Sequence, residues 1–199
     1  MDNAKRYYKK HAEEFIQRTV SLDMSDIYTP FLELLPLGSC ILDVGCGSGR
    51  DAEKFQEKGY AVTALDPVEE FVAYSSRLTG KKTLLMKVED IEFAGEFEGI
   101  WACSSLLHIR PEKMQDVFRK LNRALKEEGI LFISVKYGEF EGEKEGTFFC
   151  FYTEEKFEET RFQQAGFELV KYLYTLDKQP GRENEKWLNV YLRKVAAVT

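Results

Sequence analysis

The stretch Ile41-Leu42-Asp43-Val44-Gly45-Cys46-Gly47-Ser48-Gly49-Arg50-Asp51 decides the fold class of this chain. A short apolar strand runs into a turn with three alternating glycines, and a polar helix follows at once. Glycine permits positive φ and lacks the Cβ atom that would keep a ligand away from the backbone. The amides at the start of the helix then face a bound anionic group. The stretch predicts a turn that holds a nucleotide-like cofactor, although such turns can also need glycine for packing alone.

A second feature lies one strand further along the chain. Residues 60–65 have the pattern of a β-strand, and Asp66 stands at its carboxyl end. An acid about 20 residues beyond a glycine turn, on the neighbouring strand, is placed to accept hydrogen bonds from a ribose diol. Asp66 and Pro67 can also cap and begin the next helix. The two roles are compatible with each other.

The spacing of the glycines narrows the kind of nucleotide. A dinucleotide fold requires Gly-x-Gly-x-x-Gly, whereas this chain has Gly45-x-Gly47-x-Gly49, which is one residue shorter. The pattern that begins at Asp43 resembles the first motif of class I S-adenosylmethionine-dependent methyltransferases. The resemblance extends to about residue 195 and continues through four further segments, residues 65–67, 88–91, 99–108 and 125–132.

The resemblance implies an α/β fold with a Rossmann-like, doubly wound, seven-stranded sheet in the order 3-2-1-4-5-7-6. The sheet would be mostly parallel, with strand seven antiparallel. The alternation of strand and helix patterns along the chain agrees, because parallel strands need crossovers that cover both faces. We predict one methyltransferase domain over residues 1–199, with an N-terminal helical lid (1–37) and a sheet core (38–199).

The expected elements follow from hydrophobic periodicity and from Gly and Pro positions. Helices are predicted over residues 4–18, 25–36, 51–58, 69–78, 111–127 and 154–165. Strands are predicted over residues 41–44, 60–65, 83–86, 100–103, 130–135, 167–176 and 187–195. Residues 138–146 are charged and rich in glycine, which fits either a solvated loop or a mobile flap over the carboxyl edge of the sheet.

S-adenosylmethionine is the cofactor that the resemblance implies. Its methionine moiety would face Asp43, Gly45, Cys46, Gly47, Ser48 and Gly49, and its ribose Asp66 and Pro67. Its adenine would be bordered by Glu89, Asp90 and Ile91, and its sulfonium would lie over Cys103 and Ser104. Tyr8 and Thr19 of the N-terminal segment are further candidates for this pocket. The chain has Met86-Lys87-Val88 where the commonest second motif has Gly-Asp-Ala, so the contact to adenine stays open between Glu89 and Asp90.

His108 is the candidate catalytic residue. It follows the fourth strand at the carboxyl edge, where a histidine could take a proton from an oxygen or nitrogen nucleophile at neutral pH. The alternative is a histidine packed and hydrogen-bonded under the loop. A base is also optional, because displacement at a sulfonium carbon disperses charge and depends on alignment and water exclusion.

The acceptor side of the pocket is predicted from strand ends and from the last hairpin. The candidates are Lys136, Tyr137, Arg182 and Trp187. Lys136 is a cation at the carboxyl end of a buried strand, where an anionic substrate would dock. The alternative for Lys136 is an ordinary strand-end lysine in solvent.

Composition restricts the partners and the location of the protein. The net charge of −6 argues against general nucleic-acid affinity, because phosphate neutralisation needs a basic surface. The four cysteines form no Cys-x-x-Cys pair, so no metal site is expected. No apolar run reaches membrane-spanning length and no apolar segment follows the charged N-terminus, which predicts a cytoplasmic protein without a membrane partner.

We therefore predict a methyltransferase that acts on a small molecule by in-line methyl transfer. The chain resembles small bacterial methyltransferases of the tellurite-resistance type in size and layout. The alternatives are an RNA-modifying methyltransferase with tRNA as substrate, and a non-catalytic S-adenosylmethionine-binding protein. The acceptor, the methylated atom and the choice between monomer and homodimer stay open.

Overall fold

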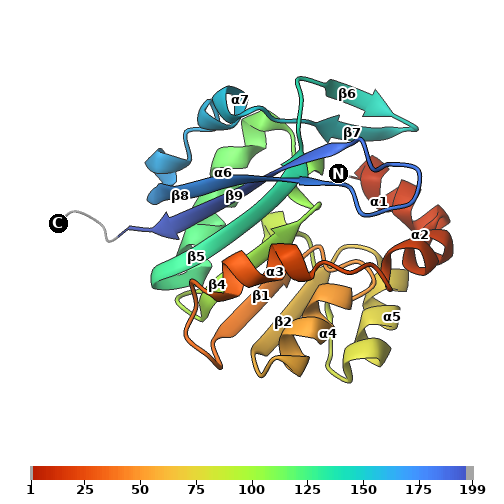
Figure 1. Cartoon of the computed structure of the whole chain (residues 1–199), viewed down its shortest axis with the longest axis horizontal. Helices are drawn as coiled ribbons and strands as arrows, with labels where there is room; N and C mark the ends of the chain where they lie inside the picture. Colours follow the sequence, from red (N-terminus) through yellow and green to blue (C-terminus); the bar gives the residue numbers. More distant parts are fainter. Residues whose placement is uncertain (1, 196–199) are drawn as a thin grey trace.

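A seven-stranded sheet organises residues 2–195, the part of the chain that the computed structural model describes (Figure 1). Its order is β3-β2-β1-β4-β5-β9-β8. The strands are β1 Cys40–Val44, β2 Ala61–Asp66, β3 Leu84–Leu85, β4 Phe97–Cys103, β5 Leu125–Lys136, β8 Phe167–Leu176 and β9 Lys186–Lys194. β9 pairs antiparallel with both β5 and β8, while the pairs among β1 to β5 are parallel. The predicted fold and strand order are confirmed.

Helices cover both faces of the sheet because its strands are apolar on both sides. They are α1 Asp2–Lys10, α2 Ala12–Thr19, α3 Ser25–Leu32, α4 Arg50–Glu57, α5 Glu69–Thr79, α6 Pro111–Ala124 and α7 Glu154–Glu158. Three short 3₁₀ turns add η1 Val88–Asp90, η2 Leu106–His108 and η3 Phe162–Ala165. Ile41 of β1 belongs to the core shared with Phe31 of α3 and Phe55 of α4. Its neighbour Leu42 points to the opposite core, which contains Phe118 of α6.

Several predicted elements have different bounds in the structure, and the helices show the largest differences. The helix expected to reach residue 127 ends at Ala124, because Leu125 already pairs with Phe97 as β5 begins. The helix expected over 154–165 divides into α7 and η3 at Arg161, whose φ of 54° is incompatible with a continuous helix. The N-terminal helix is divided at His11, which stands before α2 with a φ of −113° and a ψ of 19° and makes no capping hydrogen bond with its side chain.

The charged segment 138–146 contributes to a separate hairpin instead of a loop. Strands β6 Glu141–Lys144 and β7 Thr147–Cys150 pair antiparallel as a second, two-stranded sheet. Thr147, Phe148 and Cys150 of β7 are buried, whereas β6 is mostly exposed, so this hairpin is attached to the core through one of its two strands.

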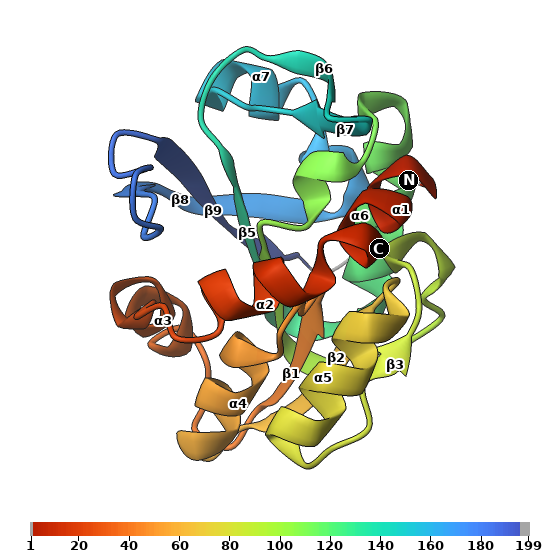
Figure 2. The ribbon, with the colours of Figure 1, turned by 90° about the vertical axis from the view of Figure 1, so that its right-hand side faces the viewer.

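The N-terminal helices lie across the carboxyl edge of the sheet. Figure 2 shows α1 and α2 passing in front of the strand ends, between the hairpin β6–β7 above and α4 and α5 below. α1 contacts β7, and α2 contacts α5. This placement encloses the region where the parallel strands end.

Candidate functional site

The glycine turn after β1 has two glycines that packing requires and one, Gly47, that lies against a side chain of the N-terminal helices. All three have positive φ, at 71° for Gly45, 53° for Gly47 and 81° for Gly49. A Cβ on Gly45 would lie 2.5 Å from the Cβ of Ser105, and one on Gly49 would lie 3.0 Å from the Cα of Ser75. These two glycines are therefore required by packing. A Cβ on Gly47 would meet only the ring of Phe15, at 3.2 Å.

Asp66, at the end of β2, lies directly beside this turn. Its Oδ2 accepts from the Gly47 N–H at 3.0 Å, and its Oδ1 accepts from the Val68 N–H at 2.8 Å. Burial raises the pKa of Asp66 to about 6, while the two backbone hydrogen bonds lower it. Helix α5 begins only at Glu69, so Pro67 is not its first residue. Asp66 connects the glycine turn to the start of α5.

Two cavities meet at this turn. The smaller one, of about 100 Å³, is lined by Asp66, Pro67, Val88 and His108 among others. The larger one, of about 620 Å³, is lined by residues of the turn, the N-terminal helices, β5 and the β8–β9 connection. Both are lined by Tyr8, Phe15, Gly45, Gly47 and Ser104. Since ligand pockets usually exceed about 300 Å³, the smaller cavity is closed to a nucleoside in this conformation.

Aromatic residues of the N-terminal helices produce this closure. Tyr8 and Phe15 pack edge to face with ring centroids 5.4 Å apart, and Phe15 lies 5.2 Å from the ring of Phe71 on α5. The predicted pocket residue Thr19 lines the larger cavity and holds Phe15 by donating its hydroxyl to the Phe15 carbonyl at 2.8 Å. Tyr8 and Thr19 thus both lie beside the glycine turn.

His108 is buried and hydrogen-bonded on both ring nitrogens. Its Nδ1–H donates to the Phe148 carbonyl at 2.9 Å, which leaves Nε2 to accept from the Tyr8 hydroxyl at 3.0 Å. Burial lowers the pKa of His108 to about 4. The residue is a neutral link between α1 and β7, and its basic lone pair is occupied in this conformation.

His108, the candidate base, and Lys136, the candidate cation for the acceptor, line different cavities. His108 lines the smaller cavity with Asp66, whereas Lys136 lines the larger one. The cause is the 3₁₀ turn η2, which follows β4 and carries His108 toward β7.

The residues of segment 88–91, which were expected to border the adenine, differ in burial and in whether they line a cavity. Val88 lines the smaller cavity, and Ile91 is in the core. Glu89 is half-buried, and its Oε2 is buried without a hydrogen-bond partner among the described residues, while Asp90 is exposed. Neither acid lines the two cavities, and Val88 is the part of this segment nearest to the site.

A buried charged network under the turn was not anticipated from the sequence. Asp51 accepts from the Arg50 guanidinium at 2.6 Å, from the Tyr28 hydroxyl at 2.5 Å and from the Trp101 indole at 2.9 Å. Burial raises the pKa of the neighbouring Asp43 carboxyl, and the charge of Asp51 adds to this effect. Arg50 and Asp51 line the larger cavity, as do Cys46 and Ser48, whereas Asp43 lies behind the turn. The only sign of this network in the sequence was the pair of charged residues, Arg50 and Asp51, directly after Gly49.

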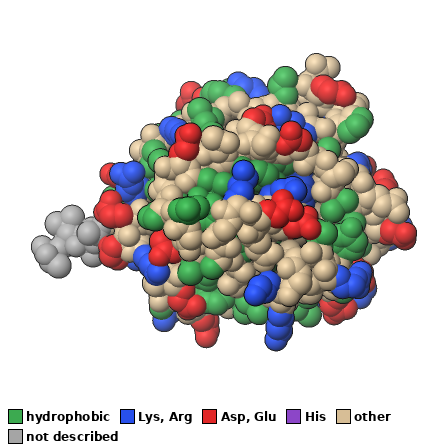
Figure 3. All heavy atoms as spheres, turned by 60° about the horizontal axis from the view of Figure 1, so that its bottom comes forward, with side chains coloured by type: hydrophobic (Ala, Val, Ile, Leu, Met, Phe, Trp, Pro, Cys, Tyr) green, Lys and Arg blue, Asp and Glu red, His purple; other side chains and the backbone are tan. Residues whose placement is uncertain are grey.

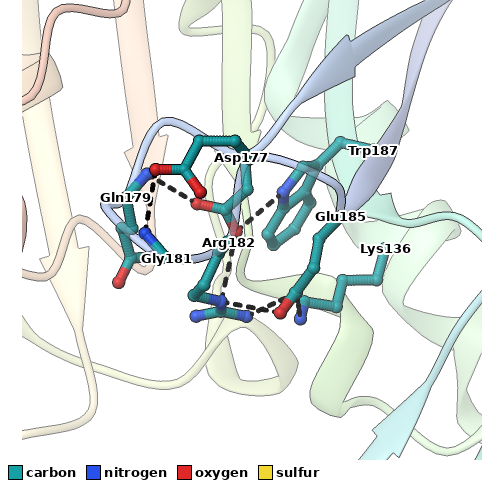
Figure 4. Close-up of polar contacts among 8 residues, drawn as sticks. Lys136, Asp177, Gln179, Gly181, Arg182, Glu185 and Trp187 are labelled. Carbon is teal, nitrogen blue, oxygen red and sulfur yellow. Dashed lines mark hydrogen bonds and ion pairs between the residues drawn. The ribbon is translucent and has the colours of Figure 1, made fainter.

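Three of the four predicted acceptor residues come together. Lys136, Arg182 and Trp187 line the larger cavity, and Figure 4 shows their side chains in one polar cluster with Asp177 and Glu185. Tyr137 is the exception, because its ring packs 5.6 Å from that of Tyr174 on β8.

Cys103, the last residue of β4, and Ser104, which follows it, line the larger cavity. Burial raises the pKa of Cys103 to about 12, so its side chain is a neutral thiol. Ser104 takes a φ of 57°, which turns the chain away from the sheet toward η2.

The described residues contain no group of three or more His, Cys, Asp or Glu side chains that could hold a metal ion. None of the helices in residues 2–195 has the length and apolar character needed to cross a membrane.

Comparisons with known proteins agree with this geometry. Residues 42–133 match the family described as "Methyltransferase domain". YqeM of Bacillus subtilis, a methyltransferase by name, is 30% identical over 118 residues, which are 55% of this chain and 48% of that protein. A ubiquinone biosynthesis O-methyltransferase of Xanthomonas oryzae is 34% identical over 105 residues, 49% of this chain and 43% of the relative. The chain thus spans about half the length of these curated relatives.

A solved structure shows the same fold over nearly the whole chain. It is the 1,6-didemethyltoxoflavin-N1-methyltransferase of Burkholderia thailandensis, determined with 1,6-didemethyltoxoflavin and S-adenosylhomocysteine. The TM-score is 0.79 at 20% identity, over 98% of this chain and 88% of that one.

Proposed function

We propose that this chain, which belongs to the class I S-adenosylmethionine-dependent methyltransferases, methylates a small molecule held in the larger cavity. The observation that carries the proposal is the position of this cavity. It extends from the glycine turn to the charged and aromatic side chains of β5 and the β8–β9 connection. An acceptor there would meet the cofactor at the turn. S-adenosylmethionine supplies a methyl group that is activated by the adjacent sulfonium.

The residues present fit the cofactor that the family uses. Asp66 offers carboxylate oxygens to ribose hydroxyls, and it is ionised at neutral pH with a pKa of about 6. Gly47 presents bare backbone to the same space. Val88 supplies an apolar wall for a base. The network of Arg50 and Asp51 fixes the start of α4, which keeps the amides of the turn in place.

The N-terminal helices form the lid of this site in our proposal. Phe15 occupies the space over Gly47, so α2 must shift when a cofactor enters. Tyr8 then holds α1 through its hydrogen bond to His108. We assign His108 to positioning the lid, because its pKa of about 4 and its occupied lone pair do not suit a general base at neutral pH.

The protein's contribution to rate would be alignment and exclusion of water. Methyl transfer from a sulfonium carbon needs the nucleophile in line with the departing sulfur, and no proton transfer is required when the acceptor is already anionic. Cys103 and Ser104 at the end of β4 would form the floor beneath the reacting atoms. The neutral Cys103 thiol leaves that floor uncharged.

The relatives support a small acceptor by analogy. One solved neighbour is named as a 1,6-didemethyltoxoflavin-N1-methyltransferase, and several curated relatives are named as ubiquinone biosynthesis O-methyltransferases. An RNA substrate is the second candidate, and the net charge of −6 speaks against it.

Transfer of a labelled methyl group tests the proposal. The purified chain is incubated with methyl-labelled S-adenosylmethionine and either total tRNA or a panel of phenols, aromatic acids, thiols and chalcogen oxyanions. Label in a small acceptor is the expected result. Label in tRNA alone would contradict the small-molecule assignment. Cofactor binding without transfer to any acceptor would favour the non-catalytic binding protein.

A further inference from the structure

Two cations of the larger cavity share one carboxylate of the protein. Lys136, the last residue of β5, forms an ion pair with Oε2 of Glu185. Arg182 binds the same carboxylate in two places, from Nε to Oε1 at 3.0 Å and from Nη2 to Oε2 at 2.8 Å. Lys136 and Arg182 line the cavity, whereas Glu185 is not among its lining residues and has a side chain that is 39% exposed (Figure 4). The carboxylate of Glu185 therefore occupies the position where Lys136 and Arg182 come together.

The second acid of this cluster is held differently. Asp177 is buried, and its Oδ2 accepts from the Trp187 indole at 3.1 Å while its Oδ1 accepts from the Gln179 N–H at 2.9 Å. Arg182 lies 3.6 Å from this carboxylate. Asp177 is thus fixed by neutral donors that a ligand would not displace. Glu185 is the carboxylate that can yield its place to another anion.

Aromatic rings flank the same cations. The Lys136 Nζ lies 5.6 Å from the ring of Phe151 and 5.7 Å from the ring of Trp187. Phe149 packs against Phe151 with ring centroids 6.3 Å apart, and all three rings line the larger cavity. An acceptor bound beside Lys136 would therefore have flat apolar surfaces on both sides.

We infer that the acceptor is an aromatic acid whose carboxylate displaces Glu185 from Lys136 and Arg182 while its ring lies between Phe151 and Trp187. This inference rests on the proposed function and specifies its substrate class. A bidentate arginine and a lysine together give a charge-assisted site for a planar carboxylate. The Glu185 side chain is 39% exposed, so its carboxylate can be solvated when it leaves the two cations.

Binding of matched probes tests the inference. The chain is first saturated with S-adenosylhomocysteine, and calorimetry then compares 4-hydroxybenzoate with 4-hydroxybenzamide and indole-3-acetate with indole-3-acetamide. A further comparison uses 4-hydroxycyclohexanecarboxylate, which keeps the charge and loses the aromatic ring. We expect at least one acid to bind about tenfold or more tightly than its amide. We also expect 4-hydroxybenzoate to bind more tightly than its saturated analogue.

Two substitutions in the cluster should change the preference for an acid over its amide in opposite directions. We expect Lys136→Gln to reduce the preference for the acid over its amide about tenfold, because it removes one cation. We expect Glu185→Gln to increase affinity for the acid, because it removes the competing carboxylate and keeps the donors Lys136 and Arg182. Lys126→Gln is the matched control, because Lys126 lies at the opposite end of β5 and pairs with Glu98. This control changes the net charge equally and should leave the preference unchanged.

The outcomes separate this inference from the proposed function. If S-adenosylhomocysteine itself does not bind, the proposed function fails and the inference fails with it. If it binds but no acid is preferred over its amide at millimolar concentration, only the acceptor class is wrong. Weaker binding of the acid to Glu185→Gln would also overturn the inference, because Glu185 would then be part of the site rather than a competitor.

Discussion

Asp66 is the residue whose protonation should control cofactor affinity. Its folded-state pKa of about 6 lies above the roughly 4 of an unfolded aspartate, because burial outweighs its two backbone hydrogen bonds. The folded protein therefore binds more protons between about pH 4 and 6, and this residue makes stability fall as pH rises through that window. In the proposed site, the ribose hydroxyls would donate to the ionised carboxylate of Asp66. Affinity for the cofactor should thus rise over the same window.

The pH prediction is measured by titrating S-adenosylhomocysteine into the wild type and Asp66→Asn. We expect wild-type affinity to be about tenfold lower near pH 5 than near pH 7, because the carboxyl is mostly protonated at the lower pH. Asp66→Asn should bind weakly at both pH values, with little difference between them. An equal pH dependence in both proteins would assign the effect to another group.

Gly47 is the turn position where a side chain interferes with a ligand more than with the fold. Gly47→Val should abolish detectable binding, because its branched side chain would enter the space between the turn and Phe15. Gly59→Val is the matched control. Gly59 also has a positive φ, at 89°, but a Cβ there has no atom within 4 Å. Thermal unfolding reports the strain in both variants, and calorimetry reports binding. Wild-type affinity in Gly47→Val would place the cofactor elsewhere.

Helices α1 and α2 are the elements whose stability should depend on the ligand. In the proposed lid movement, Phe15 would leave Gly47 and pack on the bound cofactor, while Tyr8 stays hydrogen-bonded to His108. Hydrogen exchange over residues 4–20 should slow when S-adenosylhomocysteine is added. The same measurement on Tyr8→Phe should show faster exchange in α1, because the hydroxyl bond is lost. Equal exchange with and without ligand would contradict the proposed lid and would mean that these helices only pack against the core.

Elements were predictable where local pattern and tertiary structure agree. The unit from β1 through the glycine turn to α4 was predicted within a residue or two, because its strand is apolar and its glycines are needed by packing and by φ. The end of α6 was not, because Leu125 continues the helical pattern but pairs with Phe97. The hairpin β6–β7 was missed, since its exposed strand Glu141–Lys144 has no apolar alternation.

The candidate site was predictable in part for the same reason. Asp66 and Lys136 follow from strand ends, which parallel topology brings to one edge. His108 and Lys136 line different cavities because of the path that η2 takes after β4. The sequence of this short turn has no periodic pattern from which its path could be predicted. The partners of Asp51 come from α3 and β4, and contacts between such distant segments arise only from the complete fold.

The whole molecule combines an acidic chain with a partly cationic cavity. Figure 3 shows acidic and basic side chains interspersed over the face it draws. The net charge is −6, yet the larger cavity is lined by Arg18, Arg50, Lys136, Lys144, Lys178 and Arg182. Their positive charge is partly balanced by acids that also line it: Glu14, Asp51, Glu145 and Asp177. This distribution suits a small anionic ligand better than a long polyanion, which would need an extended basic surface.

Calorimetric titration of S-adenosylhomocysteine into the wild type and Asp66→Ala tests the central claim most directly. The claim is that the cofactor lies at the carboxyl edge of the sheet, between the glycine turn and Asp66. We predict saturable binding to the wild type and about tenfold or greater weakening in Asp66→Ala, because a charge-assisted hydrogen bond contributes roughly 1.5–3 kcal/mol. Thermal unfolding of Asp66→Ala checks that the fold is retained. Unchanged affinity in a folded Asp66→Ala, or no binding to the wild type, would contradict the account.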